Sequence, residues 1–239
     1  MRTVFAFPRL TPVVRKLLFL FLGAFVLELL LDRWAGVPLY QLFALAPGAV
    51  GVETLWQLAT HVLVWPPDAG SVLPVLIGLV FLWWMMAPFE ERFGGRRTWQ
   101  LALVGTFSAS VPALLVGLLM PQPYRLSGFN PILLSTIAAF AWSLRHRGHL
   151  MLFGVVRMKA VHLIFLVVGV SLLFFLASGN VLDLVADLGA VGGGMGFIEW
   201  MSRPPGRRRR PSRGQKKRKA PFKVVQGGGS NGDGPRWLN

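Results

Sequence analysis

Six long apolar stretches limit the fold of this chain more than any other feature of its sequence. A transmembrane helix needs about 20 mostly apolar residues, and shorter helices are tolerated inside a bundle. Only 15% of the residues are charged and 54% are hydrophobic, whereas soluble domains have about 25% charged residues. We therefore predict an all-α, polytopic membrane protein with six transmembrane helices. The six stretches are 13–31, 72–89, 99–120, 129–144, 160–178 and 181–200.

The chain is predicted to have three parts: a cytoplasmic N-terminus at 1–12, a six-helix membrane domain at 13–200 and a tail at 201–239. The first stretch is interpreted as a retained helix, because no A-x-A cleavage site follows it. Residues 32–71 mix prolines with short amphipathic pieces and are predicted to form a large interfacial loop with short helices. Trp56 and Trp65 in this loop are expected at the level of the lipid headgroups.

Basic residues predict how the chain is oriented. Of the 25 Lys and Arg residues, only Arg33 and Arg125 fall in segments predicted to face outward. The positive-inside rule then places both termini in the cytoplasm. We expect a bacterial-type plasma (inner) membrane, with the 32–71 loop on its outer side.

The C-terminal tail is predicted to be disordered, because it is rich in Pro, Gly and like charge. From Ser202 onward it has 12 basic residues and one acid. Segment 203–223 directly follows a membrane helix and is expected to bind anionic lipid headgroups. It lacks interleaved aromatic residues that would stack on bases, which argues against a nucleic-acid partner.

The chain has no cysteines, which excludes disulfides, thiol catalysis and thiolate metal sites. Its four histidines are scattered along the sequence. We therefore expect no metal site and no cofactor.

The sixth stretch has a carboxylate, Asp187, in an otherwise apolar, glycine-rich segment. A charge at the centre of a membrane helix costs at least about 2.5 kcal/mol, so such an acid is expected to face protein. Gly189 and Gly193 are spaced i, i+4, as are Gly192 and Gly196. This spacing removes side chains from one helix face and predicts close contact with another helix.

Four short motifs follow one another in the order of the helices. Trp56-Gln57, followed by Thr60-His61, lies in the large loop, and Gly128-Phe129-Asn130 opens the fourth helix. A charged motif ends the second helix, where we expect its charged side chains to sit in water. The fourth motif is the glycine-rich helix of Asp187. The residues that we expect to be structural in these motifs are Trp56, Thr60, His61, Glu90, Arg92, Gly94, Gly128, Gly189 and Gly193.

In this order, the four motifs resemble those of the rhomboid family of intramembrane serine proteases. The resemblance implies a six-helix bundle with a serine on the fourth helix and a histidine on the sixth. Asn130 stands at the serine position and Asp187 at the histidine position. Pro74 and Gly78 fall where the family often has His and Asn residues that stabilise an oxyanion, and Gln57 falls where it usually has Arg. The resemblance therefore implies no catalytic residues and a catalytically inactive member.

We interpret the chain as a rhomboid-like pseudoprotease that binds transmembrane segments of client proteins without cleaving them. We expect the Asn130 amide to donate a hydrogen bond to Asp187, with the glycines bringing the fourth and sixth helices together. Lateral access for a client is expected from short helices and from spans interrupted by prolines. These prolines are Pro74, Pro88, Pro112 and Pro131.

Three alternatives stay open at this point. Ser127 is a candidate displaced nucleophile of an active serine-type endopeptidase, with Asp187 or His61 as its base. Asp183 and Asp187 share a helix face, but intramembrane aspartyl proteases resemble a pattern with one Asp on each of two helices. The third alternative is a structural membrane scaffold that acts through its basic tail.

Overall fold

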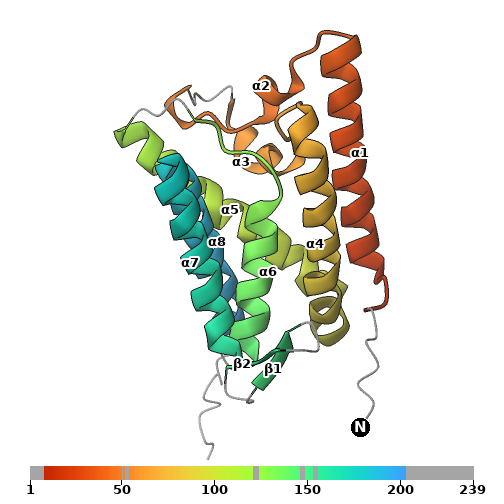
Figure 1. The fold of residues 1–239 in the computed structure, drawn as a ribbon, viewed down its shortest axis with the longest axis vertical. Coiled ribbons are helices and arrows are strands. Elements are labelled where there is room, and N and C mark those ends of the chain that lie inside the picture. The colour runs from red at the N-terminus through yellow and green to blue at the C-terminus, as the bar shows by residue number, and fades with distance from the viewer. Residues whose placement is uncertain are drawn as a thin grey trace, which may run out of the picture. The chain divides into compact units, whose positions relative to one another are not determined.

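The computed structural model of the chain describes residues 8–49, 51, 54–120, 124–145, 149–152 and 156–202. These residues form a bundle of long helices with one short β-hairpin (Figure 1). The predicted all-α, polytopic class is confirmed. The long helices are α1 (Pro12–Trp34), α4 (Val72–Phe93), α5 (Gly95–Leu119), α6 (Asn130–Ser143), α7 (Ala160–Ser178) and α8 (Val181–Ser202).

Four of these helices are long and apolar enough to cross a membrane by length and composition alone: α4, α5, α7 and α8. α1 is long enough but has Arg15, Lys16 and Glu28 along its length. α6 has 14 residues, which rise about 21 Å against a hydrocarbon core of about 30 Å. For α1 and α6, the spanning role stays a prediction.

The expected interruption of the helices by proline is wrong. α4 continues through Pro88 and α5 continues through Pro112. Pro74 and Pro131 lie in the first turns of α4 and α6, where the backbone N–H that proline lacks has no helical partner. Of the two features expected to give a client helix lateral access to the bundle, only the short length of α6 is present.

The large loop has the predicted short helices. They are α2 (Leu39–Phe43), α3 (Gln57–Thr60) and 3₁₀ turns at Pro47–Ala49, His61–Leu63 and Ala69–Ser71. The sequence did not predict the hairpin between α6 and α7, in which β1 (His149–Leu152) pairs antiparallel with β2 (Val156–Lys159).

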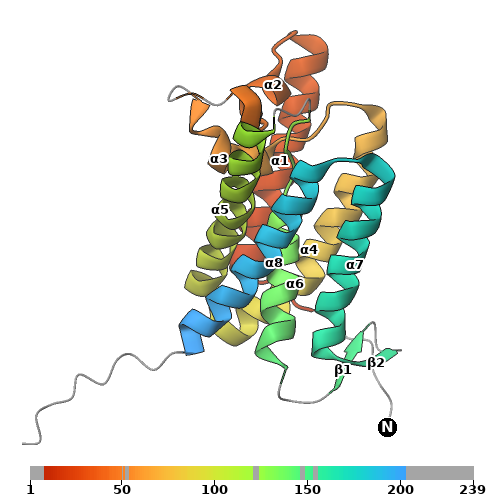
Figure 2. The same ribbon diagram turned by 90° about the vertical axis from the view of Figure 1, so that its left-hand side faces the viewer.

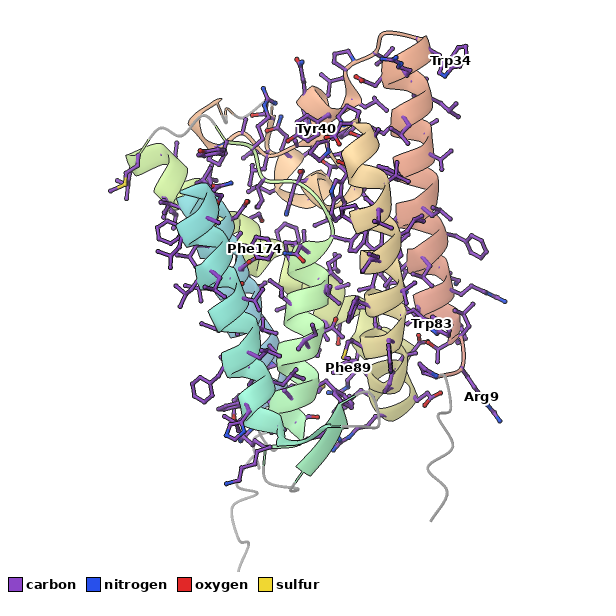
Figure 3. All side chains as sticks on the ribbon, in the orientation of Figure 1. Arg9, Trp34, Tyr40, Trp83, Phe89 and Phe174 are labelled. Atoms are coloured by element: carbon purple, nitrogen blue, oxygen red, sulfur yellow. The ribbon has the colours of Figure 1, made fainter. Side chains whose placement is uncertain are left out.

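α6 lies at the centre of the bundle and packs against α4, α5, α7 and α8. In Figure 2, α8 runs between α5 and α7, and it contacts both as well as α6. α4 packs against α1, α5 and α6. Phe89 lies between α4 and α6 (Figure 3) and is fully buried with Leu101, Ala139, Phe197 and Ile198.

Glu90 ties the C-terminal turn of α4 to the N-terminus of α1. Its carboxylate accepts hydrogen bonds from Thr11 Oγ1 (2.5 Å) and from the backbone N–H groups of Val13 and Val14 (3.0 Å each). The first N–H groups of a helix have no intrahelical partner and favour a negative charge. The expectation that this charge sits in water is therefore wrong for Glu90, which is 7% exposed.

We predict that Glu90→Ala lowers the free energy of unfolding by about 2–3 kcal/mol, because a hydrogen bond to a charged group contributes about 1.5–3 kcal/mol. The matched control is Glu91→Ala at the exposed neighbouring position, which we expect to change it by less than about 0.5 kcal/mol. Unfolding of both variants in one detergent gives the comparison. Equal losses would contradict the capping role of Glu90.

Candidate functional site

The loop motif holds α2 against α3. The Gln57 amide donates to Leu42 O (3.1 Å) and accepts from Ala46 N–H (3.3 Å). Trp56 Nε1 also donates to Leu42 O, and Thr60 Oγ1 donates to Phe43 O (3.2 Å). The motif therefore holds the segment that follows α2 in place, and Gln57 does so through hydrogen bonds to backbone groups.

His61 is fully buried at the end of this motif. Its Nδ1 lies 3.1 Å from Gln57 O, and its backbone carbonyl accepts a hydrogen bond from Gly128 N–H (2.8 Å). Burial lowers the pKa of His61 to about 4, so the ring is neutral at neutral pH. His61 makes no hydrogen bond to Ser127 or Asp187 in the described part of the chain. Its observed role is to position Gly128 through the backbone.

Gly128 and Phe129 form the turn that leads into α6. Gly128 has a φ of +88°, and a Cβ there would lie 2.8 Å from the Trp65 ring. The Phe129 ring packs on Trp65, with ring centroids 4.8 Å apart. It also lies against Gly78, where an added Cβ would be 3.0 Å away. Aromatic rings therefore fill the space beside Gly78.

Glu28, which sequence reasoning missed, fixes the position of Trp65. Its side chain is 1% exposed within α1 and accepts a hydrogen bond from Trp65 N–H (2.9 Å). The signal in the sequence is an acid inside an apolar helix, as for Asp187. Trp65, expected at headgroup level, is half-buried in the site, whereas Trp56 is half-exposed.

Asp187 is the centre of a polar cluster that joins three helices. Its Oδ1 accepts a long hydrogen bond from Asn130 Nδ2 on α6 (3.4 Å), so the predicted pair is confirmed. Its Oδ2 accepts a shorter one from Ser171 Oγ on α7 (2.7 Å). Asn130 is exposed, while Ser171 is buried. Sequence reasoning missed Ser171, because a single serine in an apolar helix gives no motif.

The other two candidate groups, Ser127 and Asp183, make no hydrogen bond to this cluster in the described part of the chain. Ser127 makes no hydrogen bond to any described residue. Asp183 accepts a hydrogen bond from Asn180 Nδ2 (2.7 Å), and Asn180 Oδ1 accepts from Leu182 N–H (3.1 Å). Asn180 and Asp183 therefore cap the N-terminus of α8. Asp183 and Asp187 have different hydrogen-bond partners.

Glycines of α8 allow its close approach to two helices. A Cβ on Gly189 would overlap Ser108 O of α5, and one on Gly193 would overlap Ser108 Oγ. A Cβ on Gly194 would overlap Ser135 O of α6, while Gly192 and Gly196 face open space. The expectation that the spaced glycines contact the fourth helix is therefore wrong for both pairs. Gly189 and Gly193 contact α5, and Gly192 and Gly196 contact no other helix.

The remaining motif residues lie away from Asp187. Arg92 donates to Ser143 Oγ (3.4 Å), and Gly94, with a φ of +84°, ends α4. Pro74 is exposed on the first turn of α4. Within the described ranges, no three His, Asp or Glu side chains lie close enough to hold a metal ion. The lipid-binding segment predicted at 203–223 lies outside the described residues.

Comparison with known proteins identifies the family. The family model of the Rhomboid domain matches residues 52–204, which is more than half of the chain. The match runs from the loop motif through α8 and leaves α1 outside it. No curated protein matches the sequence.

We predict that Ser171→Ala destabilises the protein more than Asn130→Ala does. Losing the 2.7 Å bond leaves a carboxylate oxygen without its donor, at a cost of about 1–3 kcal/mol. The 3.4 Å contact of Asn130 is weaker, and we expect a loss below about 1 kcal/mol. Ser178→Ala is the control, because that hydroxyl bonds only nearby backbone groups, Phe174 O in α7 and the Asn180 N–H two residues further on. Unfolding measurements that reverse the order of Ser171 and Asn130 would contradict this geometry.

We predict that stability falls as the pH is lowered through the range set by His61. Its pKa is about 4 in the folded protein against an ordinary value of 6.5, so the unfolded chain takes up the proton first. The free energy of unfolding is then highest above pH 6.5 and falls by up to about 3 kcal/mol towards pH 4. Subtracting the unfolding profile of His61→Asn isolates this effect. Parallel profiles for the two proteins would contradict a buried, neutral His61.

Proposed function

The chain belongs to the rhomboid family, and from this premise we propose that it is a pseudoprotease, which binds transmembrane segments of client proteins without cleaving them. The family consists mostly of intramembrane serine proteases. The observation that carries the proposal is the pair of Asn130 and Asp187, which stand where the family motifs place serine and histidine. Their 3.4 Å contact joins α6 to α8.

The chemistry of these groups supports a lack of proteolysis. An amide such as that of Asn130 has no ionisable nucleophile for a base to activate. Both oxygens of Asp187 already accept hydrogen bonds. Position 78 is a glycine and therefore offers no side-chain donor to an oxyanion. The Phe129 ring lies against it.

The surroundings of Asn130 support client binding. α4 and α7 both pack against α6, with little direct contact between them. Asn130, at the start of the short α6, is exposed. A transmembrane segment loosened by glycine or proline has unsatisfied backbone groups, which need partners within the bilayer. The exposed Asn130 amide offers such a partner, and a contact of this kind is worth roughly 0.6–2 kcal/mol.

The proposed location is a bacterial-type inner membrane, with both termini in the cytoplasm. The N-terminal ends of α1 and α7 lie at the same end of the bundle as the C-terminal ends of α6 and α8 (Figure 1). This arrangement brings the arginines that follow α4 and α6 to one end of the bundle. The proposal includes binding of the tail segment 203–223 to anionic lipid headgroups at that surface.

We predict that a photocrosslinking amino acid at position 130 captures a single-span peptide with a central Gly-Pro pair in proteoliposomes. An all-leucine peptide of equal length has no free backbone groups and is expected to be captured several-fold less. The matched control is the same crosslinker at exposed Phe165 on α7, which should capture both peptides equally. Equal capture of both peptides from position 130 would contradict a client site there.

The same preparation tests the alternative of an active enzyme. Ser171 Oγ lies 2.7 Å from Asp187 Oδ2, a distance that fits a hydroxyl beside its base. We expect a fluorophosphonate probe to leave the folded protein unlabelled. Labelling that disappears in Ser171→Ala or in Ser127→Ala would show that the protein is a serine-type hydrolase and not a pseudoprotease.

A further inference from the structure

An apolar groove runs between α5 and α8 on a face of the bundle that the polar cluster does not use. It has a volume of about 520 Å³ and is lined by Leu103, Val104, Gly193, Gly196 and Phe197, with Gln100 and Trp200. Gln100 and Trp200 also line a smaller hollow of about 250 Å³, together with Arg96 and Arg97. The two hollows share these two residues and are therefore neighbours, so we treat them together as one cleft with an apolar part and a basic end.

The basic end has two exposed cations that are open to an anion. Arg96 and Arg97 are exposed in the first turn of α5, and the N-terminal end of a helix also favours negative charge. Neither arginine forms an ion pair with a carboxylate in the described part of the chain. The nearby carboxylate of Glu199 is bound to Arg145 (2.7 Å) and Trp142 Nε1 (2.8 Å).

The apolar part has open room for a hydrocarbon chain. A Cβ on Gly196 would meet no atom within 4 Å, so this helix turn leaves a gap beside Trp200. The side chains of Leu103 and Trp200 are more than half exposed. From Arg97 to Val104 the helix rises about 10 Å. The groove therefore lies about 10 Å along α5 from the arginines. This separation matches the distance between the headgroup of a phospholipid and the upper part of its acyl chain.

We propose that this cleft binds one anionic phospholipid, with its phosphate at Arg96 and Arg97 and an acyl chain in the groove beside Gly196. The presence of two arginines beside an apolar groove distinguishes between the molecules that could occupy the cleft. A transmembrane helix would fill the groove without needing two unpaired arginines, and a soluble phosphate would need the arginines without the groove. A phospholipid uses both, and its site is independent of the client site at Asn130.

Native mass spectrometry of the full-length protein in detergent tests the basic end. We expect one phosphatidylglycerol to stay bound where phosphatidylcholine with the same chains does not. The double variant Arg96→Gln/Arg97→Gln should weaken that binding about tenfold or more, since each basic residue near a lipid headgroup contributes about 1 kcal/mol. The control Arg9→Gln/Lys16→Gln removes the same charge from exposed positions outside the cleft and should leave binding nearly unchanged. Equal weakening in both variants would overturn the site.

A second pair of variants tests the groove. Gly196→Phe fills the apolar part and should weaken binding of phosphatidylglycerol several-fold. Gly192→Phe is its match, because Gly192 also faces open space but does not line the cleft, and it should bind normally. Unchanged lipid binding in Gly196→Phe, or displacement of the lipid by millimolar glycerol phosphate, would show a headgroup site alone and overturn the proposal. Disruption of a protein dimer by Gly196→Phe, with lipid binding intact, would identify a second copy as the occupant and also overturn it.

Discussion

The close approach of α8 to α5 and α6 is the constraint on which the polar site depends. Gly189 and Gly193 contact Ser108 of α5, and Gly194 contacts Ser135 of α6, with no room for a Cβ at any of the three. Helices in a bilayer gain little from hydrophobic contact, so small residues at the interface determine how near they come. This spacing brings the carboxylate of Asp187 within reach of α6 and α7.

Three acids that are buried or half-buried connect different elements of the bundle. Glu90 joins α4 to the start of α1, Glu28 joins α1 to the large loop at Trp65, and Asp187 joins α8 to α6 and α7. In each case at least one carboxylate oxygen accepts a hydrogen bond from a different element, which compensates in part for the loss of water. Glu28 also places Trp65 against Gly128 and Phe129, so the loop and α1 together shape the turn that presents Asn130. An acid in this bundle therefore indicates a contact between elements before it indicates chemistry.

The sequence predicted the helices well, because an apolar stretch in a membrane has few alternatives to a helix. It also predicted that Asn130 meets Asp187, since the order of the motifs places their helices together. It did not predict Ser171 or the partner of Glu28, because both contacts join elements far apart in the chain and leave no local pattern. Glu90 was expected in water because it lies among charged neighbours in the sequence. Only the fold shows that the N-terminus of α1 packs against its carboxylate. The prolines were expected to break helices, but Pro88 and Pro112 lie inside continuous ones.

We propose that this rhomboid-family protein holds a membrane client without cutting it. The most direct measurement is to reconstitute the protein with the Gly-Pro single-span peptide, purify the complex and determine the mass of the bound peptide. We expect a peptide of full mass that co-purifies with the wild-type protein and is lost with Asp187→Leu. Shorter fragments in the wild-type sample that are absent with Ser171→Ala would contradict it.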